Sequence, residues 1–287
     1  MEKRDDPEFT KLGFDGLKTL VGWARDEGWN PGLHDADVFW GTDPDGFYGY
    51  YENGELVAGG SVVCYSGKFG FMGFFIVRPD LRGTGIGRRL WFQRRDKLLS
   101  RLQEGAPIGM DGVVAMQPFY QKGGFQLAFR DERHERTGQP FLLHPFVLPV
   151  KEQDMDQVVE YDSRCFGFSR PQFMQQWLNL ADASAFKYQA DGKVRGLAVI
   201  RKAAAGHRIG PLFADSRNIA EELYKACLDA APGEQVFIDI PVINSDAVAL
   251  VQKYGTNCCF ECGRMYYGKA PVMTVDKIFG ITSLELG

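Results

Sequence analysis

The chain has 287 residues, nearly twice the roughly 150 of a typical domain, which predicts two compact domains. Its 33 Lys and Arg against 37 Asp and Glu give a formal net charge of −4, which does not favour a nucleic-acid-binding surface. No apolar run reaches the roughly 18 residues of a membrane span, and the N-terminal MEKRDDPEF is not followed by an apolar signal segment. We therefore expect a cytoplasmic protein with no membrane or nucleic-acid partner.

The cysteine and glycine contents are both informative. The 6 Cys lie mostly in apolar segments, as expected for reduced core thiols, and Cys259 and Cys262 form a lone C-x-x-C without a second pair at metal-binding spacing. We expect no metal site. The 34 Gly make up about 12% of the chain against a usual 7% or so, which indicates many turns and close backbone approaches.

The first half begins with apolar residues at helical spacing over 14–27, followed by a polar loop at 26–37. Asn53-Gly54 then separates the apolar runs 47–52 and 55–65. This dipeptide is typical of a two-residue hairpin turn because both positions need positive φ. We expect two antiparallel strands there.

A third strand is expected at 69–77, where Arg78-Pro79 ends the apolar run. After a glycine-rich loop, helical periodicity returns over 86–102, and residues 110–116 resemble a short buried strand. Residues 117–123 predict a helical turn that ends at a glycine pair.

The second half repeats this order of elements. The pattern predicts two strands over 184–200 that are joined by a turn at Asp191-Gly192. It then predicts a strand at 207–213, a helix at 217–230, a strand at 235–240 and a closing helix at 245–255. We therefore expect two domains of the same fold. Three prolines within 137–150 place the boundary there, giving domains of residues 1–140 and 147–287.

The most specific motif is the loop Arg82-Gly83-Thr84-Gly85-Ile86-Gly87, between a strand and a helix. Glycines let consecutive N–H groups turn toward a ligand, and the helix N-terminus adds partial positive charge, so the loop suits an anion such as a diphosphate. Arg88 occupies the third glycine position of a dinucleotide-binding fingerprint, and no Gly-Lys pair is followed by Ser or Thr as in a P-loop. Both nucleotide-binding folds are disfavoured.

Two segments carry a family resemblance. Residues 77–90 (VRPDLRGTGIGRRL) resemble the acyl-CoA-binding segment of the GCN5-related N-acetyltransferases, and residues 119–125 (FYQKGGF) resemble that family's second signature. The resemblance covers residues 8–135, and from 150 onward it survives as element order, as in tandem acetyltransferases with a degenerate second copy. It implies an α+β (mixed α/β) fold class, with two tandem domains that each have a mostly antiparallel central sheet flanked by helices.

The resemblance also implies how a cofactor binds. Acetyl-CoA would be the cosubstrate, with its diphosphate on the loop amides and its pantetheine paired with the preceding strand. The residues implied for cofactor binding are Phe75, Ile76, Val77, Arg82, Gly83, Thr84, Gly85, Ile86, Gly87 and Arg88. A backbone N–H near Val77 would polarise the thioester carbonyl.

The implied activity is N-acetyl transfer by direct attack of a primary amine on the thioester. Tyr120 matches the family's general acid, whereas the base stays open between Glu27 and Asp111, with further carboxylates and His34 in the loop 26–37. The expected acceptor, a small-molecule or peptidyl amine, would meet the loop residues Trp29, Asp35 and Asp37.

The second copy lacks the parts that this chemistry needs. Residues 214–219 (ADSRNI) replace the glycine loop, and Val251 takes the place of Tyr120. We expect the second domain to pack against the first and to shape the acceptor pocket. A noncatalytic acyl-CoA sensor is the alternative function, and the protein could be a monomer or a homodimer.

Overall fold

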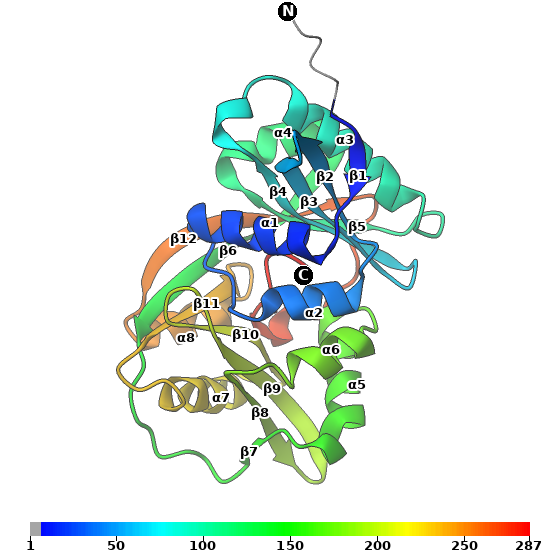
Figure 1. Cartoon of the computed structure of the whole chain (residues 1–287). Coiled ribbons are helices and arrows are strands. Elements are labelled where there is room, and N and C mark those ends of the chain that lie inside the picture. The colour runs from blue at the N-terminus through cyan, green and yellow to red at the C-terminus, as the bar shows by residue number, and fades with distance from the viewer. Residues whose placement is uncertain (1–6) are drawn as a thin grey trace, which may run out of the picture.

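The computed structural model describes residues 7–287, and the first six residues lie outside the described part. Within it, thirteen strands form one sheet that passes through both halves of the molecule (Figure 1). The strands of the first half are β1 (Phe9–Lys11), β2 (Phe47–Glu52), β3 (Glu55–Tyr65), β4 (Phe69–Val77), β5 (Ile108–Val113) and β6 (Phe125–Thr137). Those of the second half are β7 (Val147–Pro149), β8 (Ala183–Ala190), β9 (Lys193–Lys202), β10 (His207–Ala214), β11 (Gln235–Pro241), β12 (Asn257–Tyr267) and β13 (Ile278–Gly280).

Helices cover the sheet in both halves. They are α1 (Phe14–Asp26), α2 (Asp35–Thr42), α3 (Ile86–Leu99), α4 (Gln117–Lys122), α5 (Met155–Phe166), α6 (Pro171–Trp177), α7 (Arg217–Asp229) and α8 (Ser245–Lys253). None of these helices of residues 7–287 is long and apolar enough to cross a membrane.

The two predicted hairpins are confirmed. Asn53 and Gly54 have φ of 52° and 80°, and Asp191 and Gly192 have φ of 51° and 72°, so both turns use the positive φ values that the dipeptides favour. Each turn joins an antiparallel pair, β2 with β3 and β8 with β9. The remaining predicted elements also occur, with shifted ends: α3 stops at Leu99, and β5 stops at Val113 before a 3-10 turn.

Each half contains the same order of elements, which confirms the mixed α/β fold class. The sequence β2, β3, β4, α3, β5, α4, β6 in the first half matches β8, β9, β10, α7, β11, α8, β12 in the second. In each half one neighbouring pair of strands is parallel, β4 with β5 and β10 with β11, and the other pairs are antiparallel.

The two halves exchange their last strands, a feature that the sequence did not predict. The order across the middle of the sheet is β5-β12-β6-β11, so β12 of the second half pairs with β5 of the first, and β6 pairs with β11. The strands β6 and β12 also pair with each other over most of their lengths. Neither half therefore completes its own sheet.

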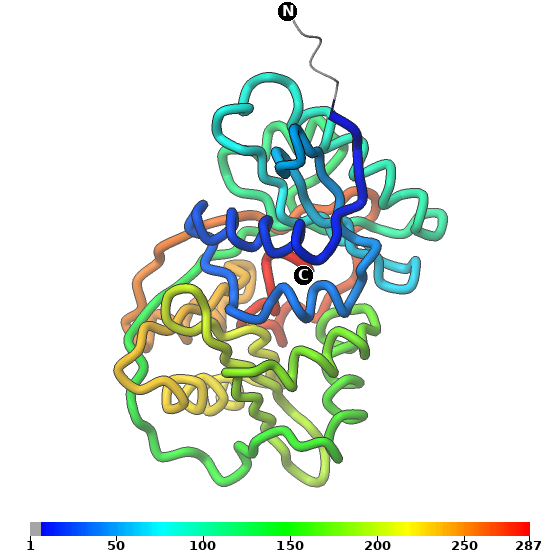
Figure 2. Tube along the Cα trace, viewed as in Figure 1, coloured from blue at the N-terminus to red at the C-terminus, as the bar shows by residue number. Residues whose placement is uncertain are grey.

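Helices α1 and α2 of the first half lie between the two halves (Figure 2). Phe39 of α2 stacks on Trp177 of α6, with ring centroids 6.3 Å apart. The loop before α2 is hydrogen-bonded to the β9–β10 turn, since Leu33 N–H donates to the Lys202 carbonyl and the Asn30 amide pairs with the backbone of Ala205. The loop is thus held by the second half.

Buried ion pairs join the halves as well. The Arg201 guanidinium of β9 donates to both carboxylate oxygens of Asp35 at 2.8 and 3.1 Å, and both side chains are almost fully buried. Burial raises the pKa of Asp35. The charges of Arg201 and Arg208 and the hydrogen bond from the Gly32 N–H together lower it by more, so the pKa of Asp35 lies below its usual value. Removing one partner of such a pair leaves an uncompensated buried charge.

We predict that Arg201→Met lowers the free energy of unfolding by about 3–5 kcal/mol near neutral pH, because Asp35 would remain buried without its cation. Chemical denaturation measures this. The matched control is Arg195→Met, because Arg195 is 41% exposed and its contact to Asp215 should contribute less than about 1 kcal/mol. Equal effects of the two substitutions would contradict this role for the buried pair.

Candidate active site

The site forms where β4 and β5 separate. These parallel strands pair only at Gly70 with Ile108 and at Phe71 with Gly109. Farther along β4 the pairing with β3 shifts register, and Phe74 adopts a φ of 50°, a backbone conformation that is unusual for a bulky residue. The result is a strand with one unpaired edge facing β5 across a gap.

Arg94 of α3 supports this irregularity. Its guanidinium, fully buried, donates to the carbonyls of Ser61 and Gly73 at 2.5 and 2.6 Å. Gly60 is required beside it, since a Cβ there would overlap the guanidinium. Arg94 lies on the same buried face of α3 as Leu90 and Leu98. A charged residue at this helical spacing among leucines is the sequence signal that could have indicated a buried arginine.

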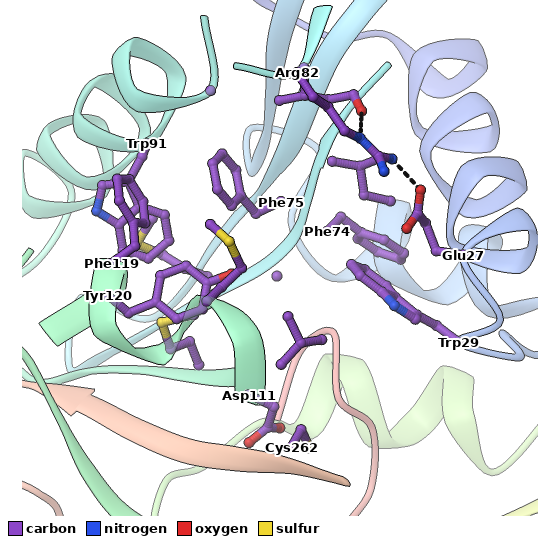
Figure 3. Close-up of a pocket in the computed structure, with 18 of the residues that line it drawn as sticks. Glu27, Trp29, Phe74, Phe75, Arg82, Trp91, Asp111, Phe119, Tyr120 and Cys262 are labelled. Atoms are coloured by element: carbon purple, nitrogen blue, oxygen red, sulfur yellow. Dashed lines mark hydrogen bonds and ion pairs between the residues drawn. The ribbon is translucent and has the colours of Figure 1, made fainter. Parts of the chain in front are cut away.

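A cavity of about 540 Å³ fills the gap and extends to the glycine loop. Its walls are mostly apolar. Figure 3 shows one aromatic group on the side of α3 and α4 and a second group on the side of the α1–α2 loop, with Arg82 and Asp111 at opposite ends. The first group is Trp91, Phe119 and Tyr120, and the second is Trp29 and Phe74.

The glycine loop leaves donors open at the start of α3. Gly83 and Gly85 have φ of 80° and 94°, and a Cβ on either would meet no atom within 4 Å. No side chain caps α3, and within residues 7–287 the N–H groups of residues 85–88 have no acceptor. Open amides at a helix N-terminus form an anion site.

The equivalent position in the second half is closed. The Ser216 hydroxyl caps α7 by accepting a hydrogen bond from the Ile219 N–H at 3.5 Å. A side chain therefore occupies the place that the glycine loop leaves open, as expected from the absence of glycine in residues 214–219.

The free edge of β4 begins next to the glycine loop. Arg78 N–H donates to the Val57 carbonyl of β3 at 2.9 Å. Successive N–H groups of a strand point to opposite sides. The N–H of Val77 therefore points to the other edge of β4, which is not paired with β5 at this position. Gly87 packs close to this strand, since a Cβ there would lie 3.2 Å from Val77. Loop amides and strand edge thus line one cavity.

Tyr120 of α4 lies in this cavity with 4% of its surface exposed. Its ring stacks on Trp91 at 4.8 Å, and Gly112 of β5 leaves room for it. Burial raises the pKa of the Tyr120 phenol well above its usual value, with Arg94 opposing the shift. The hydroxyl therefore stays protonated near neutral pH.

Asp111 of β5 also lines the cavity and is held by the second half. Arg264 of β12 donates to its two carboxylate oxygens at 2.6 and 2.9 Å. Burial raises the pKa of Asp111, and Arg264 lowers it by less, so the pKa remains above its usual value. Asp111 is thus a fixed carboxylate with increased proton affinity.

Glu27 and Trp29 form the opposite wall. Glu27 makes an ion pair with Arg82, whose guanidinium also donates to the Val77 carbonyl at 3.0 Å (Figure 3). The Trp29 carbonyl accepts a hydrogen bond from Arg133 at 2.8 Å. Glu27 therefore links the loop after α1 to the glycine loop.

The other two predicted acceptor residues do not line the cavity. Asp35 is committed to Arg201, and Asp37 is an exposed residue of α2 whose carboxylate lies 3.7 Å from His34. The polar loop predicted over 26–37 ends at residue 34, because α2 begins at Asp35. Of the predicted cofactor-binding residues, Thr84 and Ile86 are also outside the lining.

The second half supplies cavity residues that the sequence did not indicate. They are Phe260 and Cys262 of β12 and Leu284 and Glu285 near the end of the sequence. Burial raises the pKa of the Cys262 thiol well above its usual value, so this cysteine is protonated. No local sequence pattern could have placed these residues beside β4 and β5.

Two family models match the chain. Residues 14–125 match the acetyltransferase (GNAT) family, and residues 158–280 match an acetyltransferase (GNAT) domain. Both halves are therefore covered, one by each model.

Two curated relatives span almost the whole chain. A holothin acyltransferase from Pseudoalteromonas sp. (strain SANK 73390) is 31% identical over 92% of this chain and 89% of its own. An uncharacterized N-acetyltransferase, YitH, from Bacillus subtilis (strain 168) is 22% identical over 98% of both chains.

Solved structures share the fold. A putative acetyltransferase from Pyrococcus horikoshii has a TM-score of 0.83 at 22% identity, covering 100% of this chain and 99% of its own. A tandem GNAT protein from the clavulanic acid biosynthesis pathway has a TM-score of 0.64 at 14% identity, covering 93% and 100%. With two GNAT domains in tandem, this chain belongs to the GCN5-related N-acetyltransferase (GNAT) family of acyltransferases.

Proposed function

We propose that the protein transfers an acyl group, most simply acetyl, from acyl-CoA to a primary amine by direct attack. The observation that carries this proposal is the single cavity that joins open loop amides, a free strand edge and a buried tyrosine. Residues 1–140 form the proposed catalytic domain, and residues 147–287 the noncatalytic partner.

In the proposed complex, the amides of residues 83–88 hold the diphosphate, and Arg82 and Arg88 add positive charge. Pantetheine pairs with the free edge of β4 at residues 75–77, as a strand added to a sheet. A backbone N–H near Val77 polarises the thioester carbonyl and stabilises the oxyanion that forms on attack.

The chemical step needs one proton acceptor and one donor. The ammonium loses one proton to the base, its nitrogen attacks the thioester carbon, and the tetrahedral intermediate collapses as the carbon–sulfur bond breaks. The nitrogen, which becomes positively charged on attack, releases its second proton to solvent and leaves a neutral amide. Tyr120 gives its proton to the departing thiolate and regains one from solvent. The place of this protonated phenol, in the cavity beside the free edge of β4, supports the donor role.

Asp111 and Glu27 remain the two candidates for the proton acceptor. The raised pKa of Asp111 favours it, because a carboxylate with increased proton affinity takes a proton more readily near neutral pH. Glu27 is the alternative, since its ion pair with Arg82 would weaken once Arg82 meets the cofactor phosphates.

The acceptor is proposed to be a small amine that enters beside Trp29. The 31% identical relative is named for acylating holothin, so holothin belongs in the first panel of acceptors, next to polyamines, amino acids and a lysine peptide.

The first test concerns the loop. Gly85→Glu should raise the dissociation constant for coenzyme A about tenfold or more, because a carboxylate would stand where the diphosphate binds, and tenfold corresponds to only 1.4 kcal/mol. Calorimetry measures the affinity. Gly192→Glu is the matched control, since Gly192 also has positive φ and open space around it but lies in the second half. Unchanged affinity in Gly85→Glu would refute the loop assignment.

The second test concerns the donor. Tyr120→Phe should lower kcat by about 10²–10⁴-fold with little change in acyl-CoA affinity, as expected when a general acid is removed. Thiol release across the amine panel measures this. Tyr224→Phe removes an equally buried phenol of the second half and should have no such effect. Tight acyl-CoA binding without turnover in wild-type protein would favour the noncatalytic sensor.

The third test separates the two bases by their pH profiles. If Asp111 is the base, it must be ionised, so activity falls as the pH drops through the raised pKa of Asp111. Glu27→Gln should keep this acidic limb, whereas Asp111→Asn should remove it together with most of kcat. Because Asp111→Asn also removes the carboxylate that pairs with Arg264, melting curves must show that this variant is folded. The opposite pattern would assign the base to Glu27.

A further inference from the structure

The last residues of the sequence pass through the centre of the molecule, where the C label lies in Figure 1. Residues 281–287 are almost wholly buried, and only Leu284 is partly exposed. Strand β3 holds their backbone. The Tyr65 hydroxyl donates to the Leu286 carbonyl at 2.9 Å, and the Ser61 hydroxyl donates to the Glu285 carbonyl at 3.5 Å.

This segment lies against β4 at the point where β5 has turned away. A Cβ on Gly73 would overlap the carbonyl oxygen of Glu285, so the close approach depends on glycine at this position. Because side chains of a strand point out of the plane of the sheet, the segment lies on one face of β3 and β4, next to the place where β4 and β5 separate.

Neighbouring side chains of the segment have different surroundings. Leu284 lines the cavity. The Glu285 carboxyl, 2% exposed, lies 3.8 Å from the Arg208 guanidinium of β10. Hydrogen bonds from β3 to its backbone therefore hold the segment in place, with the Glu285 carboxyl beside Arg208 and the Leu284 side chain at the cavity wall.

The order of parts along the cavity defines where an acyl group would lie. From the glycine loop, β4 runs back through Val77 and Phe75 to Gly73. A pantetheine that follows this edge brings its sulfur near Tyr120, so the acyl group continues toward Gly73. The lining includes the apolar side chains of Met72, Met110 and Leu284, and two acidic residues, Asp111 and Glu285, which lie beside Arg264 and Arg208.

We propose that Leu284 closes the acyl end of the cavity and sets the length of acyl chain that the protein accepts. This inference rests on the proposed acyl-CoA-dependent function. It assigns the second half a direct contact with the acyl group, beyond holding the acceptor loop. A shorter side chain at 284 lengthens the apolar end, and a larger one shortens it.

The test compares acetyl-, butyryl-, hexanoyl- and octanoyl-CoA by kcat/KM. Leu284→Ala should raise the octanoyl-to-acetyl ratio by about tenfold or more, since even one methylene in an apolar pocket changes selectivity about 10-fold or more. Leu284→Phe should shift the ratio the other way. The control Leu142→Ala changes a leucine that is 97% exposed and should leave the ratio unchanged.

Direct binding separates this inference from the proposed function. If no acceptor gives turnover, the transferase proposal fails, but calorimetry with the same four thioesters still measures which chain length binds best. A preference for longer chains in Leu284→Ala than in the wild-type protein would then still support the inference. If turnover occurs but both Leu284 variants, folded by their melting curves, keep the wild-type ratios, Leu284 does not set chain length. Should Leu284→Ala not fold, the decision rests on Leu284→Phe.

Discussion

The separation of β4 from β5 is the constraint on which the site depends. Two parallel strands that stayed paired would use the N–H groups that a cofactor needs, and the cavity would not exist. The Arg94 guanidinium holds the irregular part of β4 through the carbonyls of Ser61 and Gly73, and the segment 281–287 packs on the face of β3 and β4 next to it. The glycine loop then adds its open amides at the wide end.

The second half acts on this site from several directions. Strand β12 supplies Arg264, which holds Asp111. Asp239 of β11 pairs with Arg133, whose guanidinium donates to the Trp29 carbonyl. Burial would raise the pKa of Asp239, but Arg133 and then Arg208 lower it to about 2, so this carboxylate stays ionised over the neutral range. The two copies of the fold have thus diverged: one keeps a helix N-terminus open for an anion, and the other caps it with Ser216.

The sequence predicted most local structure, because hairpin dipeptides and helical periodicity act over a few residues, as at Asn53-Gly54 and Asp191-Gly192. It could not predict the exchange of β6 and β12, which depends on pairing between distant segments. For the same reason Asp35 looked available for an acceptor, since its partner Arg201 lies 166 positions away. Arg82, Gly83 and Tyr120 were predicted to lie at one site because each belongs to a local motif, and all three line the cavity, whereas Leu284 has no motif around it.

The most direct measurement is a crystal structure of the protein with coenzyme A bound. The account predicts the diphosphate on the amides of residues 83–88, pantetheine along residues 75–77 with its sulfur close to the Tyr120 hydroxyl, and no cofactor at residues 214–219. Coenzyme A bound at the start of α7, or outside the gap between β4 and β5, would contradict it.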